Sequence, residues 1–156
     1  MHAHLLNPFI SSLDQAIMSF SGIHIKKRKV EILNNGLNHG TNIHVFLGVT
    51  GDLYGNVLLS TNHKNGLQLA SMMVGTGVKS YDDMSVSALQ ELLNITSGNA
   101  VTELAEMGIK ADISPPAFLT GLHLDIRVQF PLVSVLLSAE GTEFHLNLSL
   151  KTRQKK

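Results

Sequence analysis

The sequence predicts a single α+β domain, residues 1–156, in which a mostly antiparallel sheet of about six strands packs against three main helices. Several segments alternate apolar and polar residues, which indicates half-buried strands, and three longer segments repeat apolar residues at helical spacing. The strands follow one another in runs with helices between the runs, and this order favours α+β over a parallel α/β sheet. A chain of 156 residues suits one domain, and no linker divides it.

Three helices are expected, over residues 7–22, 63–74 and 85–107. Asn7 and Pro8 suit the start of the first helix, as its N-cap and its first helical residue. Gly75 follows the second helix and suits a left-handed cap. Asp82 and Asp83 precede the third and longest helix, where carboxylates favour the positive end of the helix dipole.

Six strands are expected, over residues 23–33, 42–50, 53–60, 109–114, 123–138 and 142–151. Gly51 and Asp52 turn the second strand into the third, and Glu140 and Gly141 turn the fifth into the last. Both pairs are therefore expected to be antiparallel. The basic run Lys26–Lys29 interrupts the alternation of the first strand, and such charges discourage pairing at an exposed sheet edge.

Composition and charge narrow the classes of function. Charged residues make up 15% of the chain, below the ~25% usual for globular proteins, which leaves surface for contact with a second copy. The 12 basic and 12 acidic residues balance, so no bulk field attracts nucleic acid. No apolar run reaches the ~18 residues of a membrane span, so membrane insertion is not expected. A cytoplasmic location is the default expectation.

The chain offers little for metal binding. It has no cysteine, and the close histidine pair His2 and His4 lies in a segment expected to be a flexible tail, residues 1–6. A second flexible tail is expected at residues 152–156. We therefore expect no metal site in this protein.

The helix expected at residues 85–107 has two distinct faces. Its apolar residues form a core stripe of Val86, Leu89, Leu93, Ala100, Leu104 and Met107. Ser87, Glu91, Asn94 and Gly98 fall within a band about 60° wide on the other side. Glycine is unfavourable inside a helix, so Gly98 indicates that something approaches this face closely. On spacing alone, the polar band is what any amphipathic helix shows toward solvent.

The pattern Ser87-x-x-x-Glu91-x-x-Asn94, followed by Pro115 and Pro116, resembles the signature of the CheC/CheX/FliY phosphatases of bacterial chemotaxis. The flanking residues resemble the family too, over Asn94–Asn99, Ile113–Pro116 and Gly121. CheC carries two copies of the Glu/Asn motif. Here Asp14–Ile17 occupies the comparable place in the first helix and supplies no Asn, so one site is expected, as in CheX.

The resemblance implies a CheX-like fold and a specific activity, the hydrolysis of aspartyl phosphate on a phosphorylated CheY-like receiver domain of a response regulator. It implies that Asn94 orients the attacking water and that Glu91 pairs with the receiver's lysine, with Ser87 and Gly98 at the edge of the site. The receiver would supply Mg²⁺ and the phosphoaspartate, so the protein would need no cofactor of its own. The alternative role for Ser87 is to cap the helix with its hydroxyl.

Two other functions stay open from the sequence. One is a non-catalytic module of the same fold that binds a receiver or a flagellar-switch protein, and the other is a sensor with a small ligand between helices and sheet. Which receiver is the substrate, and whether the pathway is chemotaxis or another two-component system, is also open. Low charge, long alternating strands and the resemblance to CheX together favour a homodimer through paired sheet edges, although the run Lys26–Lys29 could block one edge.

Overall fold

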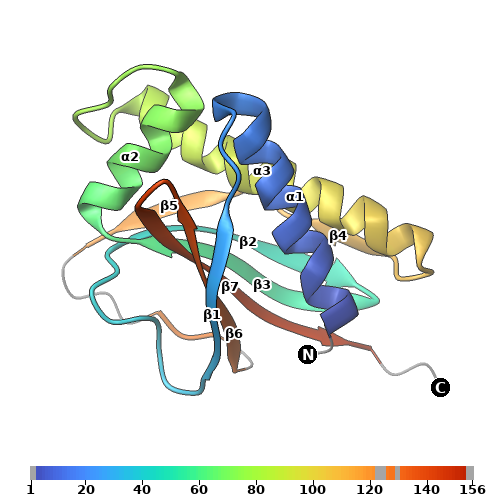
Figure 1. Cartoon of the computed structure of the whole chain (residues 1–156). Coiled ribbons are helices and arrows are strands. Elements are labelled where there is room, and N and C mark those ends of the chain that lie inside the picture. Colours follow the sequence, from blue (N-terminus) through green and yellow to red (C-terminus); the bar gives the residue numbers. More distant parts are fainter. Residues whose placement is uncertain (1–2, 122–125, 129–130, 154–156) are drawn as a thin grey trace.

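A computed structural model describes residues 3–121, 126–128 and 131–153 (Figure 1). Within this part of the chain, three helices lie over one face of a seven-stranded sheet whose strand pairs are all antiparallel. The predicted α+β class is therefore confirmed.

The elements follow one another as α1 (Ala3–Ser21), β1 (Lys26–Leu33), β2 (Ile43–Gly51), β3 (Leu53–Thr61), α2 (His63–Val74), α3 (Asp83–Glu106), β4 (Ala111–Ile113), β5 (Ala117–Thr120), β6 (Leu132–Ala139) and β7 (Thr142–Thr152). The second helix has the predicted bounds. Asn62 caps its start by accepting a hydrogen bond from the Asn65 amide, and Gly75 closes it at a φ of 86°.

The sheet is arranged almost symmetrically about its centre. Its strand order is β1-β6-β7-β3-β2-β4, and β5 also pairs with β2. In the first half of the chain, α1 leads into the edge strand β1 and then the hairpin β2–β3; in the second half, α3 leads into the edge strands β4 and β5 and then the hairpin β6–β7. The two halves meet where β3 pairs with β7.

The core lies between the helices and the sheet. Fully buried side chains come from α1, α3 and the central strands, among them Phe9, Leu13, Ile17, Leu89, Leu92, Leu93, Leu47, Val57, Leu146 and Leu148. Burial of each large apolar side chain contributes roughly 1.5–3 kcal/mol relative to leaving it in water. Because α3 buries one face in this layer, its opposite face is held toward solvent in a fixed orientation.

The ends of the chain differ from the expected tails. Residues 3–6 form the first turn of α1, so Pro8 lies inside the helix and Asn7 is not its cap. Leu5 is only 4% exposed, and this burial favours extension of the helix beyond the proline. At the other end, Thr152 belongs to β7 and the Arg153 amide donates to the Asp52 carbonyl at 2.7 Å.

Two strand predictions also need correction. Of the strand expected over residues 123–138, residues 126–128 and 131 lie outside any strand, and 123–125 and 129–130 lie outside the described residues. The observed strand β6 begins directly after Pro131, which has no amide proton for a sheet ladder. The short strand β5 was not expected, because only four residues follow Pro116 before the strand ends.

Candidate functional site

The start of α3 is fixed by a capping box. The Asp82 carboxylate accepts a hydrogen bond from the Ser85 amide at 2.9 Å, and the Ser85 hydroxyl accepts one from the Asp82 amide at 2.9 Å. The bond from the Ser85 amide is the largest cause of a lowered pKa at Asp82. The helix therefore begins two residues earlier than expected, and Ser87 is its fifth residue and not its cap.

Tyr81 attaches this end of α3 to the start of α2. Its hydroxyl donates to the His63 carbonyl at 2.6 Å, and its ring lies against the rings of His63 and Phe118. Burial raises the pKa of Tyr81 to about 12, so the hydroxyl keeps its proton and remains a donor. The first turn of α3 is thus held on two sides, by α2 and by β5.

The buried face of α3 is wider than the predicted stripe. It consists of Ser85, Leu89, Leu92, Leu93, Thr96, Ser97, Ala100 and Leu104. Val86 is only partly buried and Met107, 48% exposed, lies just beyond the helix, so both differ from the prediction. The apolar pattern missed three buried hydroxyls on this face. Thr96 donates to the Leu92 carbonyl at 2.7 Å and Ser85 donates to the Ser80 carbonyl at 2.9 Å, whereas the Ser97 hydroxyl has no hydrogen-bond partner among the described residues.

The four predicted site residues share one outward face of α3. Glu91 and Ser87 are exposed, and Asn94 and Gly98 are partly exposed. Among the described residues, neither the Glu91 carboxylate nor the Asn94 amide has a hydrogen-bond or ion-pair partner. A Cβ added at Gly98 would meet no neighbouring atom within 4 Å, so the backbone is open to close approach. This face presents a free carboxylate and a free amide one turn apart.

The segment with the two prolines borders this face. The Gln90 amide of α3 donates to the Pro116 carbonyl at 3.1 Å. Ser114 holds the other end of the segment, because its amide donates to the Gly48 carbonyl at 2.9 Å and its hydroxyl accepts from the Gly48 amide at 2.7 Å. Gln90 and Asn94 are one helical turn apart, so the proline segment is attached to α3 one turn from Asn94. Sequence reasoning missed Gln90, since its partner comes from the loop and not from the helix.

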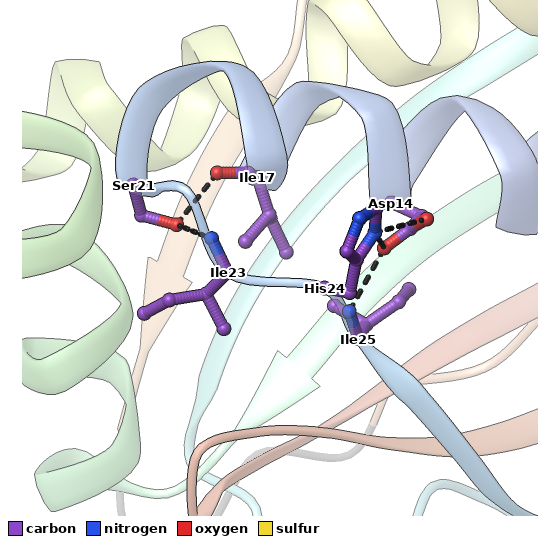
Figure 2. Close-up of polar contacts among 6 residues, drawn as sticks. All are labelled: Asp14, Ile17, Ser21, Ile23, His24 and Ile25. Carbon is purple, nitrogen blue, oxygen red and sulfur yellow. Dashed lines mark hydrogen bonds and ion pairs between the residues drawn. The ribbon is translucent and has the colours of Figure 1, made fainter.

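In α1, Asp14 stands in the place comparable to the Glu/Asn motif of α3, and its carboxylate is bound by groups of the same chain (Figure 2). Asp14 accepts a hydrogen bond from the Ile25 amide at 2.8 Å, and its two oxygens lie 3.2 and 3.1 Å from Nδ1 of His24. Ser21 secures the same turn by donating to the Ile17 carbonyl and accepting from the Ile23 amide. Asp14 therefore ties α1 to the connection that leads into β1, and its two oxygens are already engaged within the chain.

Other kinds of site find less support in the described part of the chain. No group of three potential metal ligands occurs among the described residues, and none of the described helices is long and apolar enough to cross a membrane. Two open hollows, of about 270 and 530 Å³, adjoin the loop over residues 34–42, and both are lined by His39 and His145. Neither hollow is lined by a residue of α3.

The sequence and fold match known chemotaxis proteins. The family model of the chemotaxis phosphatase CheX matches residues 43–138, a range that contains the whole of α3. The chain is 29% identical over 154 residues to the CheY-P phosphatase CheX of Thermotoga maritima, covering 97% of this chain and 99% of the relative.

Solved structures share the fold across nearly the full chain. A CheC-like superfamily protein from Shewanella sp. PV-4 has a TM-score of 0.85 at 19% identity, covering 97% of this chain and 99% of that one. CheX from Vibrio vulnificus has a TM-score of 0.82 at 20% identity, covering 96% and 100%. The CheX–CheY–BeF3–Mg+2 complex from Borrelia burgdorferi matches with a TM-score of 0.73 at 24% identity, covering 94% and 97%. With the family model matching more than half of its residues, this chain belongs to the CheX family.

Proposed function

We propose that this protein is a phosphatase that hydrolyses the aspartyl phosphate of a CheY-like receiver domain, with Glu91 and Asn94 as its catalytic residues. The observation that carries the proposal is the outward face of α3, where a carboxylate and an amide one turn apart have no partner among the described residues. Membership of the CheX family and the similarity to the CheY-P phosphatase of Thermotoga maritima support the same activity.

Asn94 suits the positioning of a water molecule. Its side-chain amide offers both a donor and an acceptor, so it can hold one water in a single orientation. Phosphoryl transfer needs positioning and charge stabilisation more than covalent help. A water held in line with the phosphorus would attack it, and the aspartate carboxylate would leave. Because α3 is packed on the sheet, Asn94 is presented without the freedom of a loop.

Glu91 suits contact with a cation on the receiver. An exposed carboxylate can pair with a lysine beside the phosphoryl group, which orients both proteins and restrains that lysine. Ser87 and Gly98 flank the two catalytic residues along the helix, and the open backbone at Gly98 permits close approach of the partner. The receiver would therefore contact α3 along about three helical turns.

We propose that the metal cofactor of the reaction, Mg²⁺, is bound by the receiver domain that is the substrate. The related complex from Borrelia burgdorferi pairs CheX with CheY, BeF3 and Mg+2. The receiver's carboxylates would hold the Mg²⁺, and this protein would contribute no metal ligand. The protein would then act in the same compartment as the receiver, and we expect that compartment to be the cytoplasm.

We also propose that the protein forms a homodimer by pairing sheet edges. The sheet has one edge at β1 and the other at β4 and β5. Pairing two copies of β1 would place both exposed basic runs, Lys26–Lys29, in one interface, and that concentration of like charge weighs against this edge. Sedimentation at high concentration should give about twice the mass of the 16.9 kDa chain, and a single-chain mass would contradict the dimer.

The function is tested by following phosphate loss from phosphorylated receivers of the same cell. Substoichiometric protein should accelerate dephosphorylation of at least one receiver over many turnovers, and Asn94→Ala should reduce the acceleration by about 10²–10³. Binding should be measured in parallel with the receiver in its BeF3-activated form. Protection or inhibition that needs equimolar protein, without turnover, would favour the non-catalytic binding module instead.

A further inference from the structure

Met84 is a strongly exposed apolar residue beside the candidate site. It is the second residue of α3 and is 66% exposed. Glu91 lies two turns further along, only about 20° round the helix axis from Met84, and Ser87 lies between them. Met84 therefore extends the face that carries Ser87, Glu91 and Asn94 by about one turn beyond Ser87, toward the start of the helix.

Single exposed apolar residues are common on protein surfaces, so exposure alone does not indicate a function for Met84. The evidence for a function is that Met84 lies close to Glu91. Met84 is separated from Glu91 by about 10 Å along the helix axis. One side of a standard protein interface covers about 800 Å², so a partner seated on Glu91 would also cover Met84. Methionine is flexible and polarizable, and it suits apolar contact with a surface of irregular shape.

The charges on α3 indicate the kind of partner. The helix contains the carboxylates Asp83, Glu91, Glu103 and Glu106 and no Lys or Arg. Asp82 adds a further carboxylate directly before it. Asp82, Asp83 and Glu91 lie within about 11 Å of Met84 along the helix axis, whereas Glu103 and Glu106 lie about 28 Å or more away. Three carboxylates therefore surround Met84, and this surface complements an apolar patch with a basic rim.

We propose that Met84 is an apolar anchor for the phosphorylated receiver and helps to determine which receiver is bound. The proposal rests on the function proposed above, because it assigns the same partner to an extension of the same face. The receiver's matching surface would carry apolar side chains beside the lysine that pairs with Glu91. Met84 would contact the receiver equally in the ground state and the transition state, so it would contribute affinity and not rate.

The test compares Met84→Ala with the control Met107→Ala. Met107 is also exposed, but it follows the other end of α3 and lies about 160° round the axis from Glu91. Met84→Ala should raise both the Kd for the BeF3-activated receiver and the KM for the phosphorylated receiver by about three- to tenfold, with kcat unchanged. Met84→Leu should restore binding to within about twofold, and Met107→Ala should match the unchanged protein.

The outcomes separate this proposal from the proposed function. If Met84→Ala binds and turns over like the unchanged protein while Asn94→Ala is strongly impaired in turnover, the anchor is wrong and the phosphatase assignment stands. A fall in kcat with no change in Kd would also overturn the anchor. If Asn94→Ala keeps full activity, the catalytic assignment fails whatever Met84 does. Circular dichroism of each variant checks that the helix is retained.

Discussion

Helices α1 and α3 occupy similar places in the fold, but the carboxylate of Asp14 in α1 is bound to its own chain and that of Glu91 in α3 has no such bond in the described part of the chain. Both helices pack on the same face of the sheet, and each is followed by a glycine with positive φ, Gly22 at 75° and Gly108 at 85°, before an edge strand (Figure 1). Asp14 of α1 is bound to its own chain, whereas Glu91 of α3 has no partner among the described residues. A free carboxylate on a rigid helix is thus a better sign of function than a carboxylate alone.

The difference has a local cause in the connection after each helix. After α1, the Ile25 amide needs an acceptor and takes it from Asp14 of the preceding helix (Figure 2). After α3, the corresponding Lys110 amide donates at 3.0 Å to Asp52, which comes from the β2–β3 turn. Because that turn supplies the acceptor, α3 needs no carboxylate for its own connection. Its outward face is therefore available for a partner.

Removal of the Asn94 amide should have the largest effect on activity. Loss of one group aligned on the transition state typically costs about 10²–10³ in rate, so Asn94→Ala should reduce turnover by that factor. Binding of the BeF3-activated receiver should change little, because the water contributes little to ground-state affinity. Single-turnover dephosphorylation and a separate binding titration measure the two effects. Full rate in Asn94→Ala would contradict the water-positioning role.

Glu91→Ala should reduce both affinity and rate, and therefore kcat/KM by about ten- to a hundredfold. The carboxylate is proposed to pair across the interface, and truncation of one member of such a pair leaves the receiver's lysine without its partner. Glu103→Ala is the matched control, since Glu103 is exposed on the same helix about 120° round the axis from Glu91. Equal losses in the two variants would indicate a general charge effect in place of a specific pair.

Asp14→Ala should act on stability and leave activity unchanged. It removes the acceptor of the partly buried Ile25 amide, and loss of such a partner costs about 1–3 kcal/mol. The midpoint of urea unfolding should fall, while dephosphorylation of the receiver at a temperature well below the transition should match the unchanged protein. A loss of catalytic rate in the folded variant would mean that α1 also takes part in the site.

The general fold could be predicted because strand alternation, helical spacing and turn glycines are local features. The bounds of α2 follow from Asn62 and Gly75, which act within a few residues of the helix. Residues that depend on distant partners were not predictable. Pro8 falls inside α1 because Leu5 is buried by the assembled core, and Gln90 matters because Pro116 reaches it from a loop.

The candidate site was found by resemblance, since spacing alone gave only an amphipathic helix. The sequence correctly grouped Glu91 and Asn94 on one outward face, because helical periodicity fixes which residues share a side. It misassigned the capping role, for which Ser87 was considered. The true cap, Asp82, is three residues upstream of the expected bound at residue 85, because its cap depends on a reciprocal side-chain bond with Ser85 that helical spacing does not show.

Ser87→Ala should therefore have the smallest effect of these substitutions. Ser87 lies in the fifth position of α3, where its hydroxyl has no capping duty, so the free energy of unfolding should change by less than about 0.5 kcal/mol. Ser85→Ala is the informative comparison, because it removes the buried hydroxyl that accepts from the Asp82 amide and donates to the Ser80 carbonyl, and the loss of such a buried partner should cost about 1–3 kcal/mol. Dephosphorylation should stay within about twofold in Ser87→Ala if the residue only borders the site. A larger loss of rate without a loss of stability would mean that the Ser87 hydroxyl contacts the receiver directly, and would extend the catalytic face by one turn.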